Sequence, residues 1–258
     1  MSITKIIAES GGTKSDWFIQ GESEIVTRSS YHRANWNDPW FEQESSFWRS
    51  HDLSTVELTF YGAGCFNDEG KVLTERKLAE IGFENITVKS DLHAAGKAVY
   101  GSSTGWCAIL GTGSVLFFWD GNDVQEIIGG KGHLEGDEGS GFYFGKLILD
   151  DYRSGKLDEN LVNLLGPSLL NSMIATGRND TKQSWASLAK LLEGNGSVYH
   201  RQNFEFFVQT HLREKGIKSI GVVGTYGAKN LQILNEVLTR FGVELTDVVE
   251  RPMVRLIE

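Results

Sequence analysis

The sequence predicts an α/β protein made of two related domains, each with a mixed sheet covered by helices. Three observations lead to this prediction. Short apolar runs alternate with helix-like segments, a three-stranded pattern occurs twice about a hundred residues apart, and the glycines gather at a few turns. The chain has 258 residues, which is long enough for two small domains with cores of their own.

The repeated pattern is a three-stranded antiparallel meander with a tight glycine turn after its first strand. Its first copy reads TKIIAESGGTKSDWFIQGESEIVTRSS, and its second reads GWCAILGTGSVLFFWDGNDVQEIIGG. The corresponding pairs are Gly12 with Gly111, Thr13 with Thr112, Ser15 with Ser114 and Phe18 with Phe117. A chance likeness between two hairpins is the alternative, and the Gly-Thr pair in both turns argues against it.

The remaining elements follow from the change between strand-like and helix-like periodicity. Between the meanders we expect strands at 56–63 and 86–88, and helices at 69–81 and from residue 91. After the second meander we expect helices at 140–153, 184–192, 199–214 and 231–241, with strands in IKSIGVVG and at 244–249. No low-complexity linker separates the halves, so we place a short hinge between domains of 1–103 and 104–258.

Composition excludes several classes of function. The net charge of −9 disfavours nucleic acid as a partner, because affinity for phosphate backbones comes mainly from clustered Lys and Arg. No apolar run suits a membrane span and no leader-like N-terminus is evident, so we expect a cytoplasmic protein without a membrane partner. Cys65 and Cys107 lack metal-ligand spacing and are expected to be reduced, buried thiols.

The segment GGKGHLEGDEGSGFYFGK, residues 129–146, places Asp137 and Glu138 among glycines just before an expected helix. Capping is the structural explanation, because a helix N-terminus presents unpaired N–H groups and favours a nearby carboxylate.

The two Gly-Thr turns have a possible function in binding phosphate. Backbone N–H groups at such turns can approach phosphate oxygens, and a Thr or Ser hydroxyl adds a donor. Two such turns suggest a nucleotide triphosphate as ligand.

The segments IIAESGGTKSDW, KSDLHAAGKAVYG, AILGTGS, GGKGHLEGDEGSG and VVGTYGAKN occur in this order. Together they resemble the N-acetylglucosamine kinase and BadF/BadG ATPase family, within the superfamily of acetate and sugar kinases, Hsp70 and actin. The likeness covers nearly the whole chain, with little contribution from residues 156–182. It implies two ribonuclease H-like (actin-like ATPase) domains with a nucleotide cleft between them. It also implies ATP and Mg²⁺ as cofactors and transfer of a phosphoryl group to a sugar hydroxyl.

The resemblance also implies roles for particular residues. Asp91 is expected to be the general base that accepts the sugar hydroxyl proton. Glu9 is expected to serve the metal, at a position where the family usually carries Asp. The nucleotide-binding residues are expected to be Gly11, Gly12, Thr13, Lys14, Gly111, Thr112, Gly113 and Gly224. The sugar-binding residues are expected to be Asn35, Asn37, Ser114, Gly130, Gly132 and Asp137.

Each of these roles has a structural alternative. Asp91 can act as a helix N-cap, the turn residues can satisfy β-turn geometry, and Gly224 can mark a plain strand-to-helix turn. Trp36 and Trp40 are as consistent with packing as with stacking on a sugar ring. The spacing of the histidines gives no metal triad, so His200 and the others are expected to be structural or exposed.

The sequence therefore predicts ATP-dependent phosphorylation of an amino sugar, N-acetylglucosamine or a related sugar such as N-acetylmuramic acid. The expected partners are the sugar and ATP, and a homodimer stays open. One alternative is a catalytically weakened nucleotide- or sugar-binding protein of the same fold, suggested by Glu9, Val115 and Lys131. Another is a BadF-type ATPase, which the two cysteines disfavour because they form no recognisable set of iron–sulfur ligands.

Overall fold

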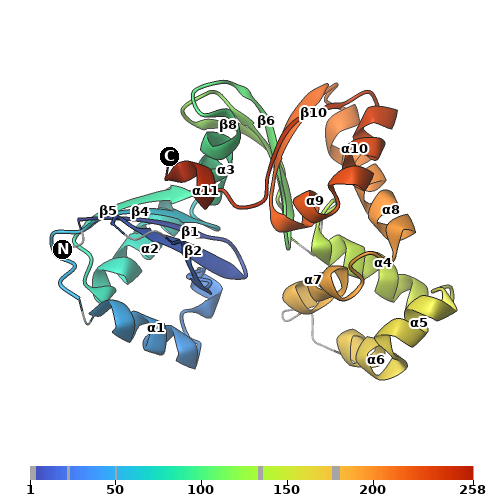
Figure 1. Ribbon diagram of the computed structural model, residues 1–258, viewed down its shortest axis with the longest axis horizontal. Coiled ribbons are helices and arrows are strands. Elements are labelled where there is room, and N and C mark those ends of the chain that lie inside the picture. The colour runs from blue at the N-terminus through green and yellow to red at the C-terminus, as the bar shows by residue number, and fades with distance from the viewer. Residues whose placement is uncertain (1–3, 22–23, 50, 133–135, 176–180, 258) are drawn as a thin grey trace. The chain divides into compact units, whose positions relative to one another are not determined.

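The computed structural model describes residues 4–21, 24–49, 51–132, 136–175 and 181–257 (Figure 1). The chain divides into two units. Unit 1 contains Met1–Gly101 and Pro252–Glu258, and unit 2 contains Ser102–Arg251. The C-terminal segment therefore packs with the first unit, although it is far from that unit in the sequence.

Unit 1 contains a five-stranded mixed sheet with the strand order β3-β2-β1-β4-β5. The strands are β1 (Lys5–Ser10), β2 (Lys14–Ile19), β3 (Val26–Ser29), β4 (Glu57–Gly62) and β5 (Asn85–Ser90). β1, β2 and β3 form the expected antiparallel meander, whereas β4 and β5 run parallel to β1. Because parallel strands end at the same edge, Ser10, Gly62 and Ser90 lie next to one another in register.

Helices cover both faces of this sheet. α1 (Pro39–Arg49) and α2 (Asp68–Ile81) lie on one face, and α3 (Asp91–Tyr100) and α11 (Met253–Leu256) lie on the other (Figure 1). The sequence analysis did not predict α1. Its buried residues, Phe41, Ser45 and Trp48, have helical spacing, and Trp48 packs against Trp17 with ring centroids 4.7 Å apart.

Unit 2 repeats the topology of unit 1. Its strands are β6 (Gly105–Leu110), β7 (Ser114–Trp119), β8 (Val124–Gly129), β9 (Ser219–Val223) and β10 (Glu244–Val249), in the order β10-β9-β6-β7-β8. The first three again form an antiparallel meander, and β9 pairs in parallel with both β6 and β10. The predicted fold class, two mixed sheets flanked by helices, is therefore confirmed.

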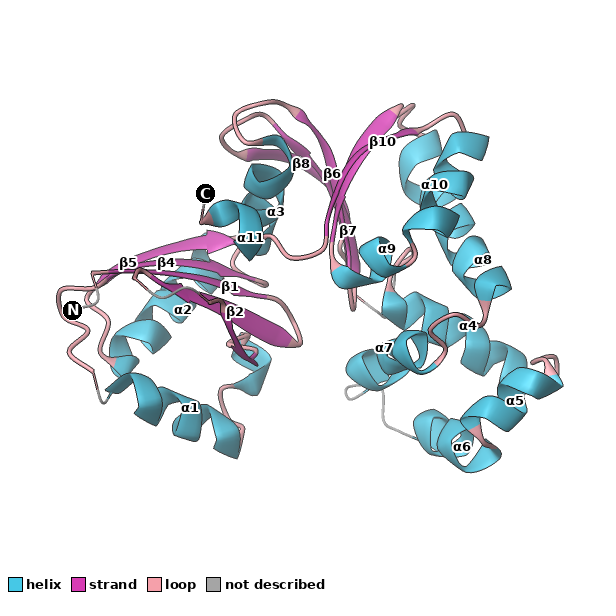
Figure 2. Cartoon of the chain, in the orientation of Figure 1, coloured by secondary structure: helices cyan, strands magenta, loops and turns pink. Residues whose placement is uncertain are grey.

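The helices of unit 2 are more numerous than predicted (Figure 2). They are α4 (Gly141–Arg153), α5 (Glu159–Leu165), α6 (Pro167–Ala175), α7 (Thr181–Leu191), α8 (Ser197–Phe207), α9 (Thr225–Lys229) and α10 (Leu231–Arg240). α8 continues into a π-helical segment, Val208–Arg213. The sequence analysis did not predict α5, α6 and α9. Among the described residues, no helix is long and apolar enough to cross a membrane.

Candidate functional site

The turn at 111–113 joins β6 to β7 and is bonded to the start of α4. The Gly111 N–H donates to the Gly113 carbonyl at 3.0 Å, which closes the turn. The first two amides of α4, those of Gly141 and Phe142, donate to the carbonyls of Gly111 and Thr112 at 2.9 and 3.1 Å. The structure thereby joins the GTGS and GDEGSG motifs, which the sequence analysis assigned to one site from the resemblance alone.

Ser114, the first residue of β7, hydrogen-bonds to both Asp137 and Glu138. Its backbone N–H donates to Asp137 Oδ1 at 3.0 Å, and its hydroxyl donates to the Glu138 carbonyl at 2.6 Å. Asp137 is buried and has a φ of 70°, a conformation that is uncommon for a residue other than glycine. The helix is capped by a different residue, Ser140, whose hydroxyl accepts the Tyr143 N–H at 3.1 Å. Capping therefore does not explain why Asp137 is there.

The buried side-chain amide of Asn203 hydrogen-bonds to the two residues that follow Glu138. Asn203 of α8 accepts the Gly139 N–H at 2.7 Å and donates to the Ser140 carbonyl at 2.8 Å and the Tyr226 hydroxyl at 2.9 Å. It is fully buried, and all of these bonds replace bonds to water. The sequence contains a signal that was missed, because Asn203 stands midway between the buried Tyr199 and Phe207 at helical spacing.

His200 belongs to this network and not to a metal site. Its Nδ1 lies 2.8 Å from the Tyr226 hydroxyl, and its ring stacks on Phe144 with centroids 4.1 Å apart. Burial lowers the pKa of His200 to about 4. The histidine is therefore neutral at neutral pH, in agreement with the structural role that was expected of it.

This pKa predicts an acid-sensitive stability. An unfolded histidine has a pKa of about 6.5, so between about pH 6.5 and pH 4 the unfolded chain binds the proton more readily. The free energy of unfolding should fall over this interval by about 3 kcal/mol. His200→Gln should remove most of this dependence in urea unfolding at pH 7 and pH 4.5, whereas His51→Gln, on an exposed histidine, should keep it. Equal pH dependence in all three proteins would contradict the prediction.

The neighbouring glycines have backbone reasons for their identity. Gly130 and Gly132 have φ values of 67° and 81°, which favour glycine. A Cβ on Gly130 would lie 3.0 Å from the side chain of Val115. Glu138 is held by His211 of the π-helical segment, with Nε2 and Oε2 3.1 Å apart. The role of these glycines toward a sugar stays a prediction.

Gly224 stands where β6 and β9 end. It has a φ of 115°, and a Cβ there would lie 2.7 Å from the Leu110 carbonyl oxygen. Its N–H donates to the Val249 carbonyl at 2.9 Å. The carboxyl ends of β6, β9 and β10 therefore meet beside the 111–113 turn. Ligands of parallel α/β sheets bind at this kind of edge.

The first turn, in unit 1, is one residue longer than the second when the length is taken between paired residues. Residues 11–14 separate Ser10 from its partner Ser15, whereas residues 111–113 separate Leu110 from Ser114. Here the Gly11 N–H donates to the Lys14 carbonyl at 3.0 Å, and the Ser30 hydroxyl donates to the Gly11 carbonyl at 2.5 Å. Lys14 is exposed and begins β2. Ser15 pairs with Ser10 across the hairpin just as Ser114 pairs with Leu110, so the predicted correspondence of Ser15 with Ser114 agrees with the register.

Glu9 lies directly opposite Asp16 on the adjacent strand. Glu9 is half-buried, and Asp16 is buried and accepts the Thr27 hydroxyl at 2.8 Å. The described residues contain no group of three or more His, Cys, Asp or Glu that could hold a metal ion. Mg²⁺ in phosphoryl-transfer sites needs only one or two carboxylates besides phosphate and water, so Glu9 and Asp16 fit it. The sequence analysis did not consider Asp16 beside Glu9, although opposite residues of a hairpin share a face.

Asp91 is the first residue of α3. It directly follows β5, at the edge of the sheet where β1, β4 and β5 end. One of its oxygens, Oδ1, accepts the Leu92 N–H at 3.1 Å. The N-cap position belongs to Ser90, whose hydroxyl is bonded to His93 Nδ1 at 2.8 Å. Asp91 is therefore not the cap, and it shares its sheet edge with the 11–14 turn.

The two asparagines differ in their surroundings. Asn35 lies in a 3₁₀ turn, Arg33–Asn35, and its amide donates to the Ser30 carbonyl at 3.0 Å, while Asn37 is exposed. Trp36 and Trp40 pack against the core of unit 1, and the Trp36 indole N–H donates to the Tyr31 carbonyl at 3.0 Å. Both tryptophans thus contribute to packing, and sugar binding by the asparagines stays a prediction.

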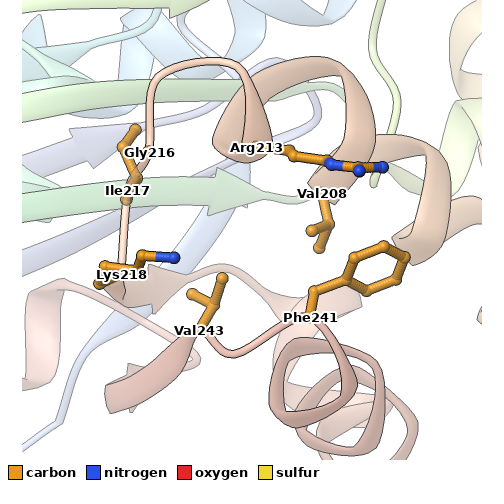
Figure 3. A pocket seen from close by; sticks show the side chains of 7 residues that line it. All are labelled: Val208, Arg213, Gly216, Ile217, Lys218, Phe241 and Val243. Carbon is orange, nitrogen blue, oxygen red and sulfur yellow. The ribbon is translucent and has the colours of Figure 1, made fainter.

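A separate recess of about 170 Å³ lies at the opposite edge of the unit 2 sheet (Figure 3). Its lining consists of Val208, Arg213, Gly216, Ile217, Lys218, Phe241 and Val243. Lys218 and Val243 directly precede β9 and β10, so the recess is at the amino ends of these strands. It does not coincide with the turns and carboxylates described above.

No protein-family model matches the sequence, and no curated protein matches it significantly. Solved structures match its fold. A candidate N-acetylglucosamine kinase from Porphyromonas gingivalis is 23% identical with a TM-score of 0.77, and the match covers 98% of this chain and 96% of that one. A candidate N-acetylglucosamine kinase from Chromobacterium violaceum is 14% identical with a TM-score of 0.71, and 95% of each chain is covered.

A third match is a ROK family glucokinase from Streptomyces griseus, solved in complex with glucose and AMPPNP. It is 13% identical with a TM-score of 0.50, and the match covers 94% of this chain and 93% of that one. The fold is thus shared with these three structures. The resemblance found in the sequence motifs is confirmed at the level of fold.

Proposed function

We propose that this protein is an ATP-dependent sugar kinase whose acceptor is a hydroxyl of an amino sugar, N-acetylglucosamine or a close relative. The observation that carries the proposal is the pair of Gly-Thr turns, each at the carboxyl edge of one of two topologically equivalent sheets. The names of the structural neighbours, two candidate N-acetylglucosamine kinases and a glucokinase with glucose and AMPPNP, support the same function.

In this proposal the oxygen of a sugar hydroxyl attacks the γ-phosphorus of ATP, and Asp91 accepts the proton of that hydroxyl. The bond from the γ-phosphorus to the β,γ-bridging oxygen breaks, and ADP leaves. The backbone N–H groups of a Gly-Thr turn bind phosphate oxygens. Glu9 and Asp16 would be the carboxylates that hold Mg²⁺. Mg²⁺, when bound, neutralises charge that develops on the phosphate oxygens.

The test is ADP release with ATP and Mg²⁺ against N-acetylglucosamine, N-acetylmuramic acid, N-acetylmannosamine and glucose. Turnover that depends on one of the amino sugars, with much less on glucose, is the expected result. A folded protein that consumes no ATP with any of these sugars would contradict the proposal.

Glu9 favours a second candidate, a nucleotide- or sugar-binding protein with weakened catalysis. Its extra methylene displaces the carboxylate by about an ångström relative to Asp, and a displacement of this size can lower the rate about a hundredfold. If the chain is a weakened enzyme, Glu9→Asp should raise kcat by about one to two orders of magnitude while the Kd for ATP changes little. Glu57→Asp, at the exposed start of β4, is the matched control. Binding of ATP without turnover in both Glu9→Asp and wild type would favour the binding protein.

A further inference from the structure

Lys182 lies against the 111–113 turn, a contact that no sequence motif predicts. It is the second residue of α7, at the end of the region with little resemblance to the family. Its Nζ is 3.0 Å from Asp137 Oδ2. A Cβ on Gly113 would lie 2.5 Å from the same nitrogen and 3.0 Å from Asp137 Oδ1. The ammonium group and the buried carboxylate therefore both touch Gly113.

The contact with Asp137 leaves hydrogen-bonding capacity on both groups. The Asp137 side chain is 2% exposed, and Oδ2 accepts no hydrogen bond of good geometry even though Lys182 is its ion-pair partner. The Lys182 side chain is 35% exposed. An ammonium group has three N–H donors, and Oδ2 can take only one of them from that direction. Lys182 can thus serve the carboxylate and a ligand oxygen together.

The N-terminus of α4 cannot supply the positive charge that a phosphate would need at this turn. Its first two amides donate to the carbonyls of Gly111 and Thr112, and the next two donate to Ser140, through the hydroxyl and the carbonyl. A phosphate here would also lie close to the carboxylate of Asp137. Lys182 is the cation that the described contacts place on the turn.

We propose that Lys182 binds a phosphate oxygen of the nucleotide at the 111–113 turn while it remains paired with Asp137. This assignment rests on the proposed ATP-dependent function. Gly113 allows the arrangement because any side chain there would displace the ammonium group. The chemistry recognised is a di- or triphosphate, not the adenosine.

The alternative is that Lys182 only neutralises the buried carboxylate of Asp137. A double variant distinguishes this role from phosphate binding. Calorimetry with ATP and Mg²⁺ should show Kd raised by on the order of tenfold to a hundredfold in Lys182→Met, because charge-assisted hydrogen bonds are lost. Lys182→Arg should retain most of the affinity. Affinity for adenosine, which has no phosphate, should not change. Asp137→Asn/Lys182→Met, which has no buried charge to neutralise, should regain thermal stability and still bind ATP weakly.

Lys190→Met is the matched control, because it removes the same charge from an exposed position of the same helix. It should leave the Kd for ATP unchanged. Recovery of wild-type ATP affinity in the double variant, or unchanged affinity in Lys182→Met, would overturn the assignment of Lys182 alone. Failure of the wild-type chain to bind ATP or ADP would overturn both this assignment and the proposed function.

Discussion

Asp91→Asn is expected to lower kcat for sugar phosphorylation by about 10²- to 10⁴-fold, the usual contribution of a general base. The substitution keeps the size of the side chain and the acceptor oxygen that bonds the Leu92 N–H. It removes the negative charge and with it the ability to take a proton. Because Asp91 is not the N-cap of α3, the helix should remain, and the Kd for ATP should stay close to that of the wild type. Coupled ADP release and calorimetry measure the two quantities.

Asp68→Asn is the matched control for this experiment. Asp68 is also the first residue of a helix in unit 1, α2, and its side chain is fully exposed. Both variants lose one favourable interaction with a helix dipole, about 0.3–1 kcal/mol each. A loss of turnover in Asp91→Asn but not in Asp68→Asn therefore reports on catalysis. If Asp91→Asn turns over at the wild-type rate, another group accepts the proton.

Gly145→Ala is expected to lower the stability of the fold, because α4 and α7 touch at this residue. A Cβ on Gly145 would overlap the Trp185 carbonyl group. Trp185 cannot move away easily, since its indole N–H donates to the Met173 carbonyl at 3.0 Å and its ring stacks on Phe142 with centroids 5.3 Å apart. Overpacking costs about 1–3 kcal/mol, occasionally more, and a clash with backbone atoms belongs at the upper end.

Gly141→Ala in the same helix serves as the comparison. A Cβ there would lie 3.5 Å from the Ala186 side chain, which is an ordinary contact, and Gly141 is the first residue of α4. Thermal unfolding should show a clear fall in Tm for Gly145→Ala and little change for Gly141→Ala. Since α7 carries Lys182, Gly145→Ala should also weaken ATP binding. A similar Tm for the two variants would mean that the helices separate without cost.

Much of the fold could be predicted because local periodicity encodes it. The strand predicted at 244–249 has the same bounds as β10, and the helix predicted at 69–81 starts one residue after α2 does. The two meanders were recognisable because apolar strands and Gly-Thr turns recur. α9 could not be predicted, because its five residues are too few to show a helical period.

The candidate site was predictable only in part. The turns, Asp91 and Asp137 carry motif signals, but Asn203 and Lys182 reach the site from helices that lie far from it in the sequence. Asn203 binds Gly139 and Ser140, and Lys182 lies against Asp137 and Gly113. The helical spacing of Asn203 with Tyr199 and Phe207 indicates burial but no partner, and Lys182 belongs to no such pattern, so only packing shows what each one contacts.

The sequence by itself determined the alternation of strands and helices, the duplicated sheet and the glycine turns, since each depends on residues close together in the chain. The tertiary structure decided where the chain ends pack and which side chains meet. Met253 and Leu256 of α11 are buried beside Ile7 and Ala94 of unit 1, and Arg255 donates to the Ala98 carbonyl at 3.1 Å. Such contacts join residues more than a hundred positions apart. They form because burying apolar surface is favourable wherever a complementary face exists, which local periodicity does not record.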